Sequence, residues 1–185
     1  MNILKIYNKT NWKILEAVKY ERLNLRDIAR RLGMSPAAVH NNLRILGGFN
    51  LISVEKDKNQ HLVIPNPDNF YYRSFMQLIN YRKMQSCKAL KNLEKIGVIG
   101  VYGSFASGTD EKGSDIDLVI FTEAGEIEVR EAANKLSQQM DKEINLLMLN
   151  RRKLDNLKKN DYEFYMRLRL QSITFNGDIF AGTIY

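Results

Sequence analysis

A short proline-containing segment about a third of the way along the chain constrains its architecture most strongly. Pro65-Asn66-Pro67-Asp68-Asn69 interrupts the chain, because proline lacks a backbone donor and forces the residue before it into an extended conformation. No helix or strand is therefore expected to continue through this segment. We predict one domain over residues 1–69 and a second over residues 70–185, each large enough for a core of its own.

Three short helical patterns precede the break. The first is capped by Thr10 and runs through Tyr20, the second is capped by Asn24 and ends at Gly33, and the third starts at Ser35-Pro36. Serine and asparagine are favoured caps, proline suits the first helical turn, and glycine suits the residue after a helix. Two strand-like runs then flank the polar turn 56–59. Three helices followed by a hairpin predict a helix-turn-helix with a wing.

The run LRDIARRLGMSPAAV over residues 25–39 resembles the winged helix-turn-helix DNA-binding domains of prokaryotic regulators, and the resemblance extends over about residues 8–65. It implies that the third helix enters the major groove, where amide and guanidinium groups read base edges, and that the wing meets phosphates. The residues expected at duplex DNA are Ser35, Ala37, His40, Asn41, Arg44, Lys56 and Lys58. A homodimer is expected if this domain reads a palindrome. A unit used only for protein contact or dimerisation is the alternative.

After the break, residues 70–94 carry apolar side chains at helical spacing and are predicted to form one long helix that leads into the second domain. Cys87 falls among the apolar positions and is expected to be a buried structural thiol, since no neighbouring motif would activate it. A single cysteine excludes an internal disulfide and a Cys-based zinc cluster. With no signal pattern and no apolar run near the roughly 18 residues of a membrane span, we expect a cytoplasmic protein without membrane contact.

The strongest motif joins two strand-like runs. Gly103-Ser104 ends one predicted strand, and Asp115-Ile116-Asp117 begins the next. Side chains alternate along a strand, so the two carboxylates lie on one face and repel each other unless a cation or proton lies between them. Carboxylate oxygens favour Mg²⁺, which completes its shell with water and phosphate oxygens. Gly103 allows close backbone approach to a ligand, and Ser104 offers a hydroxyl and an amide to an anion. A triphosphate carrying Mg²⁺ would therefore fit both the Gly-Ser turn and the aspartate pair.

Gly103-Ser104, ten intervening residues and Asp115-Ile116-Asp117 together resemble the minimal nucleotidyltransferases, a prokaryotic branch of the DNA polymerase β superfamily. The resemblance covers about residues 70–185 and implies an α/β domain with a mixed sheet flanked by helices, so the whole chain is expected to be an α+β protein. It also implies a nucleoside triphosphate, two Mg²⁺ ions, and transfer of a nucleoside monophosphate to a hydroxyl of a protein or small molecule.

By the same resemblance, Asp115 and Asp117 would hold the metals, and Gly103 and Ser104 the phosphates. Lys112 could reach a phosphate or remain a solvated loop lysine. Some members of this branch are antitoxins that modify a partner toxin, so a toxin is a possible protein acceptor.

An amide stands where the family usually has a third carboxylate. The next predicted strand reads Glu143-Ile144-Asn145 and onward, and the expected acid aligns with Asn145. An amide is no general base and adds no negative charge to a cation site. Glu143 points to the same face and could substitute, or the acceptor or water could handle the proton. The alternatives are an active enzyme, a DNA-binding regulator whose degenerate transferase domain senses a nucleotide, and an adaptor that binds neither.

Overall fold

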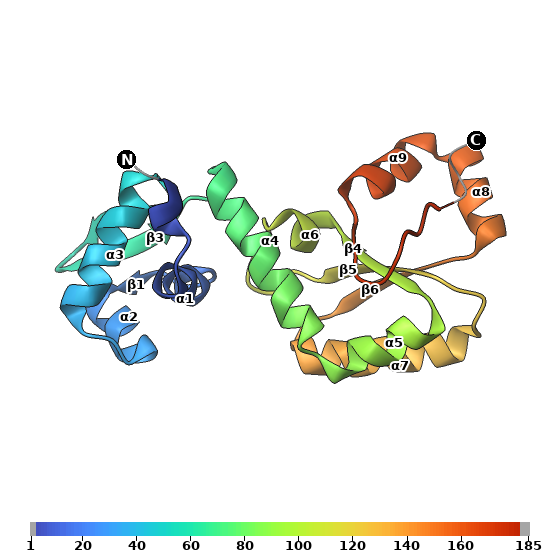
Figure 1. Cartoon of the computed structure of the whole chain (residues 1–185), viewed down its shortest axis with the longest axis horizontal. Coiled ribbons are helices and arrows are strands. Elements are labelled where there is room, and N and C mark those ends of the chain that lie inside the picture. The colour runs from blue at the N-terminus through green and yellow to red at the C-terminus, as the bar shows by residue number, and fades with distance from the viewer. Residues whose placement is uncertain (1–2, 182–185) are drawn as a thin grey trace. The chain divides into compact units, whose positions relative to one another are not determined.

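The computed structural model describes residues 3–181 and has two compact units that divide between Ile79 and Asn80 (Figure 1). The division falls inside helix α4 (Phe70–Gln85) and not between residues 69 and 70, where the proline segment predicts it. Tyr72 and Phe75 explain the difference, because both are buried in the core of the first unit. The start of α4 therefore completes the first unit. The chain is an α+β protein, as predicted.

The first unit has the winged helix-turn-helix order. Its three-stranded antiparallel sheet has the strand order β1-β3-β2, and the wing is the hairpin of β2 and β3. The elements are η1 (Ile3–Ile6), α1 (Lys9–Val18), β1 (Leu23–Asn24), α2 (Leu25–Leu32), α3 (Pro36–Gly48), β2 (Ile52–Asp57) and β3 (Gln60–Pro65).

Local capping explains where these helices begin and end. The Asn24 side chain accepts from the Asp27 amide at the start of α2, and the Ser35 hydroxyl accepts from the Ala38 amide at the start of α3. Gly33 ends α2 with a φ of 63°, which favours glycine because it lacks a Cβ. These three predictions are confirmed. The predicted Thr10 cap is wrong, because Asn8 caps α1 instead.

The predicted long helix over residues 70–94 is also wrong. The chain forms α4 and then α5 (Lys88–Ile96), separated at Ser86 and Cys87. Cys87 has extended backbone angles, φ −77° and ψ 126°, and the change of direction lets α5 pack against α7 (Glu126–Met140). Its thiol is buried with Sγ 3.4 Å from Met140 Sδ. Burial raises the pKa of the Cys87 thiol, and the positive charge of Lys83 only opposes this, which supports the predicted structural role.

The second unit is built on a mixed four-stranded sheet in the order β6-β5-β4-β7. Strands β5 and β6 are parallel, whereas β4 pairs antiparallel with β5 and with β7. The remaining elements are β4 (Val98–Tyr102), α6 (Gly103–Ser107), β5 (Ile116–Phe121), β6 (Ile144–Leu149), α8 (Arg151–Asn160), α9 (Tyr162–Gln171) and β7 (Ile173–Thr174).

Helices cover both faces of this sheet (Figure 1). Leu118 of β5 packs in the cluster that includes Leu90 of α5 and Leu136 of α7. Its neighbour Val119 packs in the other cluster, with Leu154 of α8 and further residues of α9. Adjacent strand residues point to opposite faces, so β5 is buried on both sides. The predicted mixed sheet flanked by helices is confirmed.

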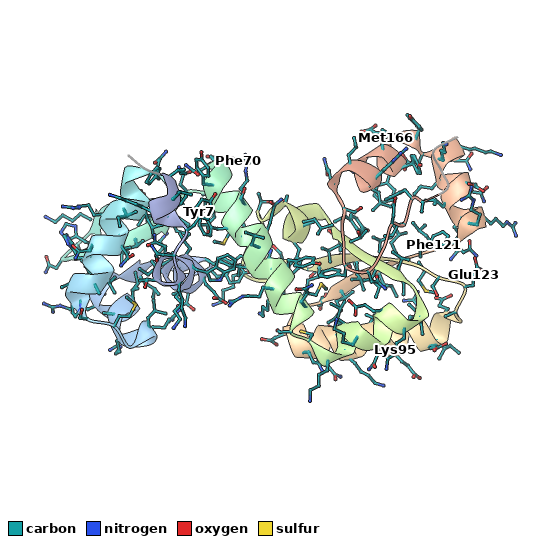
Figure 2. All side chains as sticks on the ribbon, in the orientation of Figure 1. Tyr7, Phe70, Lys95, Phe121, Glu123 and Met166 are labelled. Carbon is teal, nitrogen blue, oxygen red and sulfur yellow. The ribbon has the colours of Figure 1, made fainter. Side chains whose placement is uncertain are left out.

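The surface carries several large apolar side chains, and Tyr7 (53% exposed) and Phe70 (68% exposed) of the first unit are marked in Figure 2. Across residues 3–181, none of the helices has the length and apolar character needed to cross a membrane.

Candidate functional site

The turn after β4 presses directly against one of the two predicted metal ligands. Tyr102, the last residue of β4, pairs with Asp117 of β5. Gly103 then turns the chain into α6 with a φ of 66°, and a Cβ on it would lie 2.2 Å from Asp117 Oδ2. The sequence predicts that Gly103 lets the backbone approach a ligand. The structure shows that the closest group is the Asp117 carboxylate, so glycine is required for that side chain to keep its position.

Asn145 faces both aspartates. The parallel register of β5 and β6 sets Asn145 beside Asp117. Its Nδ2 donates to Asp115 Oδ2 and to Asp117 Oδ1, each at 3.3 Å. The amide therefore bridges the two carboxylates and offsets part of their mutual repulsion. Among the candidate acids and amides of the second domain, these three are brought together by the sheet.

Glu143 does not complete a third carboxylate position. It precedes β6 and is exposed, and its backbone carbonyl accepts from the Ile116 amide at 2.8 Å. Within residues 3–181, no three His, Cys, Asp or Glu side chains form a group that could hold a metal ion. The alternative in which Glu143 replaces the missing acid therefore gains no support.

The donor chemistry of the site nevertheless fits a divalent cation. Asp115 and Asp117 supply carboxylate oxygens, the ligands that Mg²⁺ prefers, while water and phosphate oxygens usually complete its shell. Both side chains are partly exposed and so accessible to such a complex. Rotation of the Asn145 amide would offer Oδ1 as a neutral ligand. Two carboxylates and one amide carry less negative charge than three carboxylates, so a second cation would be held more weakly.

The predicted phosphate-binding residues Ser104 and Lys112 differ in their surroundings. Ser104 lies in the first turn of α6 and is half-buried, and within the described chain its hydroxyl has no hydrogen-bond partner. Its carbonyl accepts from the Thr109 amide at 3.0 Å, which closes the turn. Lys112 is exposed in the following loop, and both predictions for it stay open.

Sequence reasoning missed the residues that hold this loop in place. Asp110 is buried and accepts from Asn80 Nδ2 at 2.7 Å. Lys142 Nζ donates to the Ser114 carbonyl at 2.7 Å and lies 4.0 Å from Asp110 Oδ2. These contacts join the two ends of the loop to α4 and to the segment before β6. No local sequence signal marks them, because the partners are about 30 residues apart.

A second group that sequence reasoning missed lies beside Asp117. Burial raises the pKa of the Tyr102 phenol, the Asp117 charge raises it further, and Arg167 lowers it. The Phe164 ring packs edge-on against Tyr102 with centroids 6.1 Å apart, and the Arg167 guanidinium lies 5.2 Å from the Phe164 centroid. Helix α9 therefore brings an aromatic surface and an exposed cation next to the carboxylates.

The predicted DNA contacts lie on the first unit, and all of them are exposed. Ala37, His40, Asn41 and Arg44 lie on α3, and Ser35 caps it. Lys56 lies on β2 of the wing, and Lys58 occupies its turn with a φ of 52°. This exposure is what contact with DNA requires, and the contact itself stays a prediction.

Comparisons with known proteins match both halves of the chain. Residues 85–163 match the family model described as polymerase beta, nucleotidyltransferase, and residues 7–46 match a model described as winged helix-turn-helix DNA-binding. No curated protein matches the chain.

Similar solved structures cover about half of the chain. One is a toxin-antitoxin crystal structure with AMP-PNP, at 20% identity and a TM-score of 0.37, covering 54% of this chain and 73% of that chain. Another is the tri-AMPylated Shewanella oneidensis HEPN toxin in complex with the MNT antitoxin, at 19% identity and a TM-score of 0.35, covering 55% and 73%.

Proposed function

Because this chain joins a winged helix-turn-helix domain to a nucleotidyltransferase domain of the polymerase beta type, we propose that its second unit binds a nucleoside triphosphate with Mg²⁺ and transfers the nucleoside monophosphate to a hydroxyl group. One observation carries the proposal: Asp115 and Asp117 converge on a common bridging group, Asn145 Nδ2. The chain keeps the two acids close together at an accessible face of the sheet, and a cation would relieve their repulsion better than an amide does.

Each residue of the site would have a separate role in binding. Asp115 and Asp117 would hold the cation, and Gly103 keeps Asp117 in position by leaving room for its carboxylate. Ser104, at the start of α6, would donate its hydroxyl and amide to the terminal phosphates. When bound, divalent cations neutralise phosphate charge and orient the attacking and leaving oxygens. Asn145 cannot accept the proton of the attacking hydroxyl, so that proton passes to the acceptor's own groups or to water.

The acceptor is proposed to be a hydroxyl of a protein. The motif's resemblance to minimal nucleotidyltransferases makes a partner toxin the protein class to test first, with a small-molecule hydroxyl as the other possibility. We expect slower transfer than at a site with three carboxylates, because the Asn145 amide cannot act as a general base.

The test is transfer of label from α-³²P nucleoside triphosphates in the presence of Mg²⁺ and either cell lysate or a co-purified partner. We expect label on a protein with the wild type and none with the Asp115→Ala/Asp117→Ala double variant. The matched control is Glu128→Ala/Glu131→Ala, which removes the same two charges from exposed positions of α7. Equal transfer by the wild type and both double variants would refute metal-dependent transfer at this site.

A second candidate function follows from Asn145, whose amide already occupies the space between the carboxylates. In this case the domain senses a nucleotide without transfer, and the first unit acts as a DNA-binding regulator, dimeric if its operator is palindromic. Nucleotide binding without any label transfer would favour it.

The DNA-binding role of the first unit has its own test. Contacts to phosphates release counterions, so affinity for duplex DNA must fall steeply as salt rises. We expect Arg44→Ala to weaken duplex binding and the control Lys13→Ala, on the exposed surface of α1, to change it little. Absent or salt-independent binding would contradict this role.

A further inference from the structure

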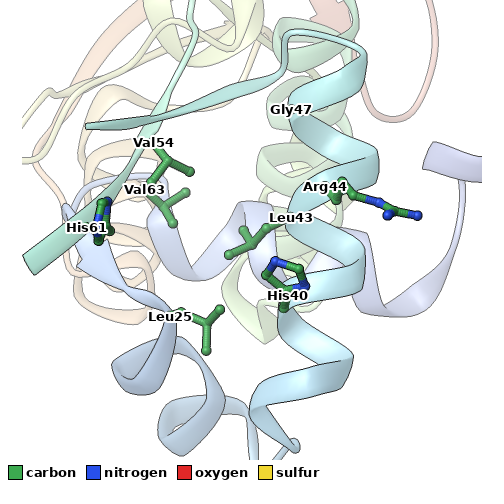
Figure 3. A pocket seen from close by; sticks show the side chains of 8 residues that line it. All are labelled: Leu25, His40, Leu43, Arg44, Gly47, Val54, His61 and Val63. Carbon is green, nitrogen blue, oxygen red and sulfur yellow. The ribbon is translucent and has the colours of Figure 1, made fainter. Parts of the chain in front are cut away.

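The first unit contains a pocket that shares His40 and Arg44 with the predicted DNA contacts. It lies between α3 and the wing strands, has a volume of about 630 Å³, and is shown in Figure 3. Four aliphatic side chains line it: Leu25 at the start of α2, Leu43 on α3, and Val54 and Val63 on the wing. Sites for small organic ligands usually measure roughly 300–1,000 Å³ and are mainly apolar with a few polar groups. This pocket has both properties.

The polar groups around the pocket are nitrogen-bearing. The chain has two histidines, and both line this pocket, His40 from α3 and His61 from β3 (Figure 3). Arg44 also lines it, with its guanidinium directed away from the cavity (Figure 3). On the hairpin, Lys56 pairs with His61, and directly opposite residues share a face of the sheet. The rim therefore offers imidazole hydrogen-bond donors, and Lys56 adds a positive charge on the same face of the hairpin.

Negative charge is absent from the lining that the structure describes. A neighbouring pocket shares Leu25 and His61 with this one, and its described lining includes the acid Asp27. Its carboxylate accepts from Arg30 and from the Asn24 side chain, each at 2.7 Å. Because Asp27 is already paired, the pocket surroundings favour a negatively charged ligand.

We infer that this pocket binds a small amphipathic anion, with an apolar body against the four aliphatic side chains and a single carboxylate-type group at the imidazoles of His40 and His61. The apolar body distinguishes this ligand from the phosphate groups of DNA, which have no apolar surface to bury against Leu43 or Val63. Since His40 and Arg44 are also predicted DNA contacts, an occupant would lie on the surface that duplex DNA is expected to cover.

The two histidines make the inference directly testable, because their imidazole resonances in a ¹H–¹³C correlation spectrum report on this pocket alone. The probe is 4-phenylbutyrate, and 4-phenylbutylamine is its matched cation with the same apolar body. We expect saturable shifts of both imidazole signals with the anion, and binding of the amine weaker by roughly tenfold, the size of one unit-charge contact near a protein surface.

Two variants of the wing test where the ligand binds. Val54→Glu puts a carboxylate at the pocket mouth and is tolerated because Val54 is 53% exposed. Ser53→Glu is the control, since Ser53 is exposed on the same strand but points to the other face. We expect Val54→Glu to weaken phenylbutyrate binding roughly tenfold and Ser53→Glu to leave it within about twofold. No saturable shift, equal binding of the amine, or equal weakening by both variants would overturn the inference.

Discussion

Replacing Gly103 by alanine tests whether the turn after β4 positions the Asp117 carboxylate. Two consequences can be separated. The first is backbone strain, because a residue with a Cβ at a φ of 66° loses roughly 1–2 kcal/mol of folding free energy. The second is displacement, because the new Cβ would lie 2.2 Å from Asp117 Oδ2.

The size of the displacement follows from ordinary contact distances. Carbon and oxygen atoms approach to about 3.3 Å even in favourable contacts, so the carboxylate oxygen must move by roughly 1 Å. The clashing atom is the end of a flexible side chain, so the move adds little to the loss of stability. A misplacement of about 1 Å in a reacting group can nevertheless lower a rate by roughly 100-fold. Gly103→Ala should therefore damage function far more than folding.

Gly113→Ala is the matched control, since Gly113 has a φ of 86° and its Cβ would meet no atom within 4 Å. Urea unfolding followed by circular dichroism should show similar losses of stability in both variants. Calorimetry with nucleoside triphosphates and MgCl₂ should show binding weakened at least about tenfold in Gly103→Ala alone, given that displacement. Equal nucleotide binding by the two alanine variants would refute the positioning argument.

Three further predictions follow from contacts of the second unit. Asn145→Asp replaces the bridging amide by a third carboxylate. We therefore expect MgCl₂ to raise the melting temperature of this variant more than that of the wild type, and label transfer to increase. Equal melting-temperature shifts and equal transfer in the two proteins would contradict this. Lys142→Met leaves the buried Asp110 carboxylate with one partner fewer, which should lower the free energy of unfolding by roughly 3 kcal/mol, whereas Lys135→Met on the exposed surface of α7 should change it little. The raised pKa of Tyr102 means that folding favours the protonated phenol, so its contribution to stability is present below about pH 10 and is lost as pH rises further. The variant Tyr102→Phe should therefore lose less unfolding free energy than the wild type between about pH 9 and 11. Identical pH profiles of the two proteins would refute this prediction.

Short-range features of this protein were readable from its sequence. The caps Asn24 and Ser35 and the left-handed Gly33 lie where the residue types predict them. Each depends on backbone geometry and hydrogen bonds within about one helical turn. Alternation along a strand likewise sets Asp115 and Asp117 on one face, because it depends only on the two-residue period of the backbone.

Longer-range features were decided by tertiary packing. Helical periodicity continues through Ser86 and Cys87, yet the helix breaks there because α5 packs on α7. The pairing of Lys142 with the loop joins residues that no local pattern connects.

The candidate site also combines features that the sequence predicts with features that only tertiary packing decides. Sequence alone assigned two carboxylates and an amide to the candidate site, because that assignment depends only on motif spacing and residue type. Only the parallel register of β5 and β6 decided that the Asn145 amide bridges both carboxylates. The physical reason is range: backbone preferences act over a few residues, whereas the contacts of a side chain depend on which distant segments the folded core brings beside it.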